Sequence, residues 1–237
     1  MSERFSASVA ARHMACPASA HLDLAIPNWV APVDDRTADN AANRGTLRHE
    51  MTEPIFGLPA RDILEMSALF GYVGKLRESR RFSVLVEQEV TAEWLTSRPT
   101  TKADLVLFTK DEIHVLDQKW GRLPVDVIDN AQLLYYAVCY APLAPLAKGV
   151  TLHIMQPKLD RFEQWWVSAA VLKDFMFEAQ QAEKRILAGD VTFGPSDHCT
   201  FCPANPHSRR DKGKPLCPAM MTLLYPSYLD EDEILSL

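Results

Sequence analysis

Two apolar, strand-like segments joined by a short polar connection constrain this chain more than any other feature. ADLVLFT (103–109) and IHVLDQKW (113–120) flank the three polar residues at 110–112. Short runs of this kind, rich in β-branched residues and closely spaced, predict adjacent strands of a hairpin. Asp104 lies near the start of the first strand and Asp117 near the end of the second. Antiparallel pairing would therefore bring the two carboxylates together.

The rest of the chain mixes helical and extended patterns. Helical patterns cover residues 6–25, 44–54, 60–80, 130–143 and 171–189, a loop is expected over 27–43, and strand patterns cover 84–91, 150–159 and 162–171 with a turn at 160–161. Helices, three strands, a helix, two strands and a last helix predict an α/β or α+β fold. No repeat or low-complexity segment interrupts this order.

Size and composition indicate one elaborated globular domain. The chain has 237 residues, of which 47% are apolar and 24% charged, which excludes collagenous, coiled-coil and largely disordered proteins. The formal net charge of −6 argues against nonspecific coating of polyanions. No apolar run approaches the ~20 residues that span a bilayer, and the polar start lacks a secretion signal. We therefore expect a cytoplasmic protein without membrane contact.

The two acids and a nearby lysine could perform metal-assisted chemistry. Residues two apart in a strand share a face, so Asp117 and Lys119 face one way while Gln118 turns away. Adjacent carboxylates repel, and Mg²⁺ or Mn²⁺ would relieve this repulsion and activate water for phosphodiester hydrolysis. Lys119 could orient that water or neutralise developing charge. The alternative is that Asp104 and Asp117 are solvent-facing strand ends, with Lys119 as their surface ion pair.

Two helical segments supply further polar groups. His49 lies four residues after Gly45 in a predicted helix and could be a third metal ligand. Gln132 and Tyr136 are four residues apart on a later helix, so they share a face. Taken singly, a helical histidine and such a pair are more typical of ordinary packing.

In this order, the segments resemble the RecB-like branch of the PD-(D/E)XK nuclease superfamily. That branch has a G-x-x-x-H helix, an aspartate on one strand, a (D/E)-x-K on the next and a Q-x-x-x-Y helix. The resemblance implies an α/β, restriction-endonuclease-like core over residues 44–190, with a mixed sheet flanked by helices. It also implies roles for the matching residues: His49, Asp104, Asp117 and the Gln118 carbonyl as metal ligands, Lys119 as the catalytic lysine, and Gln132 and Tyr136 as residues that position the nucleic acid. Glu87 or Glu89 is a candidate accessory acid, depending on strand register.

Four of the five cysteines indicate a second metal site. Cys199 and Cys202 form a C-x₂-C pair, Cys217 follows, and Cys16 lies far upstream. In a cytosolic protein this spacing favours a metal over disulfides. A zinc site of four cysteines, or of three cysteines with His198 or His207, and a set of free buried thiols are the alternatives on spacing alone. Cys139, on the apolar side of its helix, is expected in the core.

The cysteine pattern is similar to that of the iron–sulfur subgroup of RecB-like nucleases, which includes the AddB nuclease domain and the CRISPR-associated iron–sulfur exonucleases. The segment from Ser6 to Pro17 also resembles that subgroup's opening motif. The resemblance implies a [4Fe-4S] cluster with these ligands: Cys16, Cys199, Cys202 and Cys217. The cluster would fasten a flank of residues 1–26 and 195–218 to the core of a single nuclease domain, 1–237.

Together these features predict a metal-dependent DNA nuclease of the exonuclease type, similar to stand-alone phage or prophage recombination nucleases. No Walker A pattern occurs in the sequence, so DNA must arrive as an end, as a single strand or through a partner such as a helicase or a single-strand annealing protein. The alternatives are a noncatalytic nucleic-acid-binding or scaffold protein that retained the fold, and a nuclease with zinc in the cysteine site.

Overall fold

A five-stranded mixed sheet is the centre of the computed structural model, which describes residues 5–25, 71, 83–195, 197–205 and 217–219. Its strands, in spatial order, are β1 (Ser83–Val86), β4 (Leu105–Phe108), β5 (Glu112–Gln118), β6 (Gly149–Gln156) and β7 (Arg161–Ser168). The β5–β6 pair is parallel and the other neighbours are antiparallel. Two short strands, β2 (Glu89–Thr91) and β3 (Thr100–Lys102), form a separate antiparallel pair.

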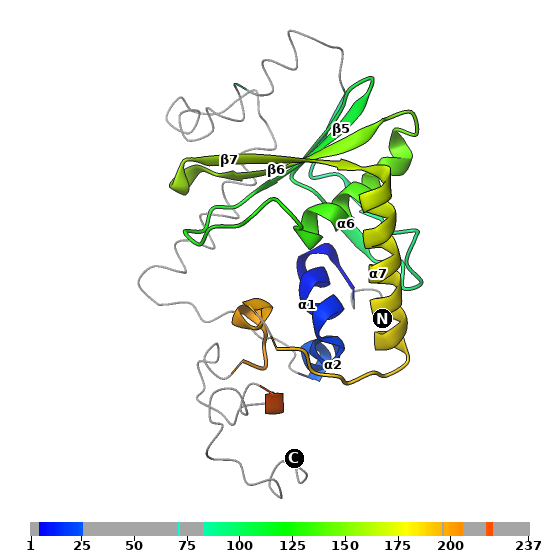
Figure 1. Cartoon of the computed structure of the whole chain (residues 1–237), viewed down its shortest axis with the longest axis vertical. Coiled ribbons are helices and arrows are strands. Elements are labelled where there is room, and N and C mark those ends of the chain that lie inside the picture. The colour runs from blue at the N-terminus through cyan, green and yellow to red at the C-terminus, as the bar shows by residue number, and fades with distance from the viewer. Residues whose placement is uncertain (1–4, 26–70, 72–82, 196, 206–216, 220–237) are drawn as a thin grey trace, which may run out of the picture.

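Helices pack against one side of this sheet (Figure 1). They are α1 (Ala10–Ala15), α2 (Pro17–Ala25), α6 (Ala131–Tyr140) and α7 (Ala169–Leu187). Helix α6 contacts β5 and β6, α7 contacts β7, and α1 contacts both helices. Their apolar faces and the inward residues of the strands, such as Val106, Val115 and Leu152, form one buried core. The expected mixed sheet flanked by helices is confirmed.

Within the described residues, most of the predicted elements are present. The hairpin of β4 and β5, the helix α6 and the pair of β6 and β7 all lie where the sequence predicts them. Helix α7 ends where expected, because Gly189 has a φ of 84°, a conformation that side-chain-bearing residues rarely adopt.

The single helix predicted over residues 6–25 is wrong. The segment contains a 3₁₀ turn (Ala7–Val9) followed by α1 and α2, which are separated at Cys16. Cys16 has φ −135° and ψ 85°, outside the helical region. Pro17 explains the break, since its ring disfavours helical geometry at the preceding residue and it has no amide hydrogen to donate.

The single strand predicted over residues 84–91 is also wrong. The chain leaves the five-stranded sheet after β1, passes through Glu87 with a φ of 47°, and continues as β2 in the smaller sheet. The left-handed backbone at Glu87 ends the extended run. The predicted loop over 27–43 and the helices over 44–54 and 60–80 lie outside the described residues.

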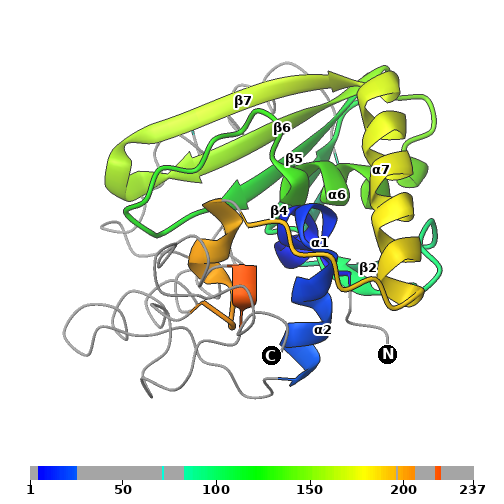
Figure 2. The same cartoon turned by 60° about the horizontal axis from the view of Figure 1, so that its bottom comes forward.

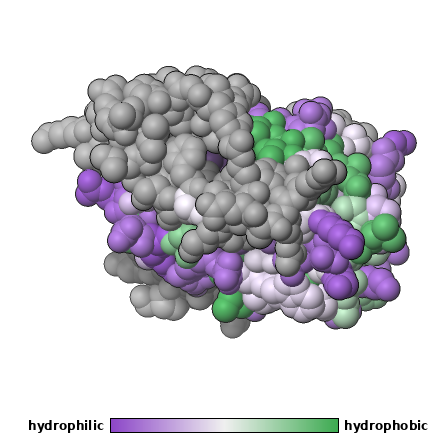
Figure 3. All heavy atoms as spheres, turned by 90° about the horizontal axis from the view of Figure 1, so that it is seen from above, coloured by the Kyte–Doolittle hydropathy of each residue, from purple (hydrophilic) through white to green (hydrophobic). Residues whose placement is uncertain are grey.

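The surface of the described part is of mixed polarity. Figure 3 shows hydrophilic and hydrophobic residues side by side on one face of the molecule. None of the helices within the described ranges combines the length and apolar character that a membrane crossing needs.

A buried acid on α7 generates the first prediction. Glu183 is 3% exposed and accepts hydrogen bonds from the amides of Thr96 and Ser97, each at 2.8 Å, and from the Ser97 hydroxyl. Glu183→Ala would leave these donors without their acceptor, so we expect the free energy of unfolding to fall by about 2 kcal/mol. Urea denaturation followed by circular dichroism measures the change. Glu178→Ala, at an exposed position of the same helix, is the matched control, and equal stability of the two variants would contradict the prediction.

Candidate active site

The two aspartates meet at one end of the β4–β5 hairpin. Leu105 pairs with Leu116, so Asp104, just before β4, lies beside the last residues of β5. The Gln118 amide donates to Asp104 Oδ2 at 2.6 Å. Asp117 is 4% exposed, so its carboxylate is largely removed from bulk water. The strand register therefore brings both predicted acids to the same sheet end.

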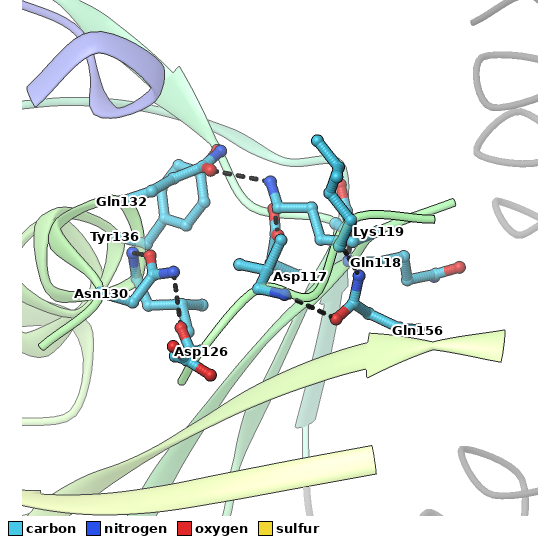
Figure 4. A network of polar contacts seen from close by, with 12 residues as sticks. Asp117, Gln118, Lys119, Asp126, Asn130, Gln132, Tyr136 and Gln156 are labelled. Carbon is cyan, nitrogen blue, oxygen red and sulfur yellow. Dashed lines mark hydrogen bonds and ion pairs between the residues drawn. The ribbon is translucent and has the colours of Figure 1, made fainter. Parts of the chain in front are cut away.

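Lys119 connects the strand end to α6 (Figure 4). Its Nζ lies 2.7 Å from Asp117 Oδ2 and donates to Gln132 Oε1 at 2.8 Å. Gln132 Nε2 in turn donates to the Tyr136 hydroxyl at 2.8 Å. These contacts form a continuous polar chain from the carboxylate on β5 to the phenol on α6, and the shared faces predicted for Asp117 with Lys119 and for Gln132 with Tyr136 are confirmed.

The loop between Lys119 and α6 is held near its middle and at its end. Asn130 caps α6 by accepting from the Leu133 amide at 3.1 Å, which fixes the turn that carries Gln132. Gln156, at the end of β6 and fully buried, accepts from the Val125 amide at 2.8 Å and donates to the Leu123 carbonyl at 2.9 Å. These three hydrogen bonds limit the freedom of the segment that joins the two halves of the site.

Sequence reasoning missed Tyr140, which supports the other half of the site. Its hydroxyl accepts from the Ala103 amide at 3.2 Å and donates to the Gln88 carbonyl. It thereby holds the backbone just before Asp104 against α6. The signal was present, because Tyr140 follows Tyr136 by four residues and shares its helix face. No comparable signal pointed to Gln156, whose contacts are long-range.

Burial and negative charge shape the electrostatics. Burial raises the pKa of Tyr136, and the charge of Asp117 raises it further. The phenol therefore stays protonated at neutral pH and remains a hydrogen-bonding group. Lys119 compensates the charge of Asp117, so the site carries opposite charges within 3 Å of each other.

The structure also separates the two candidates for an accessory acid. The Glu87 amide donates to the Asp104 carbonyl at 3.2 Å, which places Glu87 next to the site, and its carboxylate pairs with Lys102 at 2.6 Å. Glu89 is exposed at the start of β2. His49 and Gly45 lie outside the described residues.

The four predicted cysteine ligands gather in a second place. Cys16, Cys199, Cys202 and Cys217 are all buried and line one cavity, which we call the cysteine cavity. The 3₁₀ segment η4 (Asp197–Phe201) contacts α1, and Figures 1 and 2 show the segments 197–205 and 217–219 beside α2. His198 lines the same cavity, whereas His207 lies outside the described residues.

Local hydrogen bonds shape the cysteine cavity. The Cys202 amide donates to the Cys199 carbonyl at 3.0 Å, and Asn205 Nδ2 donates to the same carbonyl at 2.9 Å. Ser19 Oγ donates to the Cys16 carbonyl at 2.7 Å. None of the five cysteines is in a disulfide.

Cys139 is separate from this group. It is 7% exposed in the main core and accepts from Trp94 Nε1 at 3.4 Å. Burial raises the pKa of its thiol to about 12, so it stays neutral. The prediction of a core cysteine is confirmed.

The donor atoms of the two places suit different metals. Within the described residues, no three His, Cys, Asp or Glu side chains have the geometry to hold a metal ion as they stand. The oxygen donors of Asp104, Asp117 and the Gln118 carbonyl suit a hard divalent cation, and four buried sulfurs around one cavity suit iron–sulfur or zinc. The residue chemistry at each place therefore fits the metal that the sequence predicts.

Comparisons with known proteins bear on the family and the fold. Residues 72–237, more than half of the chain, match the family model described as "Protein of unknown function (DUF2800)". The chain belongs to this family. It is similar to the crystal structure of a candidate exonuclease from Eubacterium rectale, with a TM-score of 0.52, 13% identity and coverage of 94% of this chain and 93% of that chain. It is also similar to the crystal structure of SSO0001, with a TM-score of 0.48, 14% identity and coverage of 89% and 85%. At such identities the similarity concerns the fold, and the first structure shares its mixed α/β arrangement.

Proposed function

We propose that this chain is a divalent-metal-dependent deoxyribonuclease that hydrolyses phosphodiester bonds from DNA ends. The observation that carries the proposal is the convergence of Asp104, Asp117 and Lys119 at one sheet end, where Lys119 also donates a hydrogen bond to Gln132. The fold shared with the candidate exonuclease from Eubacterium rectale supports the same reaction class.

The chemistry of each side chain indicates its role in the proposed reaction. Asp104, Asp117 and the Gln118 carbonyl, with His49 proposed from the sequence, would hold Mg²⁺ or Mn²⁺. When bound, the ion would polarise the scissile phosphate and lower the pKa of a coordinated water. Lys119 offers its ammonium to the attacking water or to the charge that develops on the phosphate.

The helix α6 completes this site. Gln132 fixes the position of the Lys119 ammonium through its 2.8 Å contact, and Tyr136 holds Gln132. Because Tyr136 stays protonated, it adds no negative charge that would repel the DNA phosphates. The substrate reaches the site as an end or a single strand, delivered where needed by a helicase or a single-strand annealing protein. The biological setting we propose is phage or prophage DNA recombination.

The cysteine cavity forms part of the proposal as a structural metal site. Cys16, Cys199, Cys202 and Cys217 would hold a [4Fe-4S] cluster, for which four thiolates are the usual ligand set. The segments that carry the last three cysteines contain few apolar residues and many prolines. Such a composition offers little apolar surface to bury, so a metal would supply order that packing does not.

Removing either aspartate should abolish turnover without unfolding the chain. Asp117→Ala or Asp104→Ala deletes a metal ligand and part of the site's negative charge, so Mg²⁺-dependent degradation of end-labelled DNA should fall at least about 10²-fold. Asp174→Ala, at an exposed position on α7, is the matched control. Undiminished cleavage by Asp117→Ala would contradict the proposal and favour a noncatalytic DNA-binding protein.

Lys119→Ala should separate catalysis from metal binding. An ammonium cannot ligate the ion, so calorimetric Mn²⁺ affinity should stay near that of the wild type while turnover falls about 10²–10³-fold. Lys148→Ala, at an exposed lysine with a carboxylate 3.5 Å away, controls for the loss of one cation. If Lys119→Ala lost metal affinity but kept normal turnover at saturating Mn²⁺, the role assigned to Lys119 would be wrong.

Cys202→Ser should remove the metal from the cysteine cavity and loosen the C-terminal segments. We expect loss of the visible absorption of an iron–sulfur cluster in anaerobically prepared protein, and faster proteolysis of the flank while the central sheet resists. Cys139→Ser should change neither, since Cys139 lies in the main core. If wild-type protein contains one zinc and no iron or sulfide, the assignment of an iron–sulfur cluster is wrong, while the proposal of a metal site formed by the cysteines stands.

A further inference from the structure

A buried arginine lies against the cysteine cavity. Arg12, on α1, is 9% exposed and lines the cavity together with the four cysteines. Burial raises the pKa of the Cys202 thiol, and the charge of the neighbouring Arg12 guanidinium opposes that shift. The Cys16 amide donates to the Arg12 carbonyl at 2.8 Å, so one helical turn carries both a proposed ligand and the cation.

A carboxylate and an imidazole hold this guanidinium in place. The two terminal nitrogens of Arg12 donate to the two oxygens of Asp23, on α2, at 2.7 and 2.8 Å. His13 Nε2 lies 2.9 Å from Asp23 Oδ2, and His13 is 1% exposed. A guanidinium has five N–H donors, so Asp23 leaves others to face the cavity. The arrangement fixes the direction in which Arg12 presents its charge.

The remaining lining of the cavity gives this charge little to interact with. Apart from the thiols and two polar neighbours, Ser19 and His198, the lining is apolar, with Leu22 and Phe193 as examples. Burying a cation costs free energy unless a negative group lies near it. Asp23 provides such a group on only one side of the guanidinium. Neutral thiols would supply no such charge, whereas four thiolates on a metal or cluster carry a net negative charge.

We propose that Arg12 is the positioning residue that donates to the Cys202 sulfur and stabilises the negative charge of the metal–thiolate group, with Asp23 holding the guanidinium. This proposal rests on the metal site of the proposed function and goes beyond it. Hydrogen bonds to sulfur and the net charge around a cluster set its reduction potential. Reduction adds a negative charge, so a nearby cation raises the potential and a nearby anion lowers it.

Redox titration of the full-length chain, loaded anaerobically with iron and sulfide, tests the proposal. Arg12→Gln should shift the midpoint potential of the cluster to a lower value. Asp23→Asn should shift it to a higher value, because the charge of Arg12 is then uncompensated. Arg98→Gln, which removes an exposed arginine paired with Glu93, should leave the potential unchanged. Looser packing alone would not shift the midpoint potentials of Arg12→Gln and Asp23→Asn in opposite directions.

The outcomes decide the role of Arg12. Unchanged potentials in both variants, or shifts of the same sign, overturn the proposal. If circular dichroism shows that Arg12→Gln does not fold, Asp23→Asn alone carries the test, and an unchanged or lowered potential overturns it. Arg12→Lys keeps the positive charge but lacks the planar guanidinium. Its midpoint potential should be closer to that of the wild type than the midpoint potential of Arg12→Gln.

A zinc experiment separates the role of Arg12 from the identity of the metal. If wild-type protein forms no cluster but retains Zn²⁺, the iron–sulfur assignment fails. Arg12→Gln should then release Zn²⁺ to a chromogenic chelator about tenfold faster than the wild type and Arg98→Gln, as is usual for loss of a residue that supports a metal ligand. Equal release rates overturn the proposal. Retention of neither metal by the wild type overturns it together with the metal site.

Discussion

The antiparallel register of β4 against β5 determines where the two aspartates of the candidate active site lie. Val106 pairs with Val115, and both are fully buried in the core beneath α6. Two residues further along β5, Asp117 occupies the same face. A slip of one residue would turn the valines outward and Asp117 to the opposite face. The apolar core therefore selects the register, and the register assembles the acids.

Helix α6 connects this sheet end to other parts of the molecule. Gln132 and Tyr136 face the strand end, and Tyr140 holds the backbone before Asp104. Successive helical residues point about 100° apart. Tyr135 therefore points elsewhere, and its hydroxyl donates to the Phe5 carbonyl at 2.9 Å. One helix thus contacts both the candidate active site and the N-terminal flank, so the position of each affects the other.

The sequence predicts these features unevenly, for physical reasons. The β4–β5 hairpin and the shared face of Gln132 and Tyr136 follow from local periodicity, and the structure contains both. The break at Cys16 was predictable in principle from Pro17, a local signal. The change of sheet at Glu87 and the parallel β5–β6 pairing were not, since both depend on which strands meet in space. For the same reason the contacts of Gln156, which supports the site from β6, had no sequence signal.

The segment after α7 is joined to the N-terminal helices by contacts that need no metal. The Ala18 amide donates to the Thr192 carbonyl at 3.1 Å. Gly194 packs so closely on α1 that a Cβ there would lie 2.1 Å from the Ala15 carbonyl oxygen, a distance no side chain could occupy. These contacts dock the segment after α7 onto the N-terminal helices before the chain reaches Cys199. A metal bound to the thiols would therefore act on a scaffold that backbone packing has already positioned.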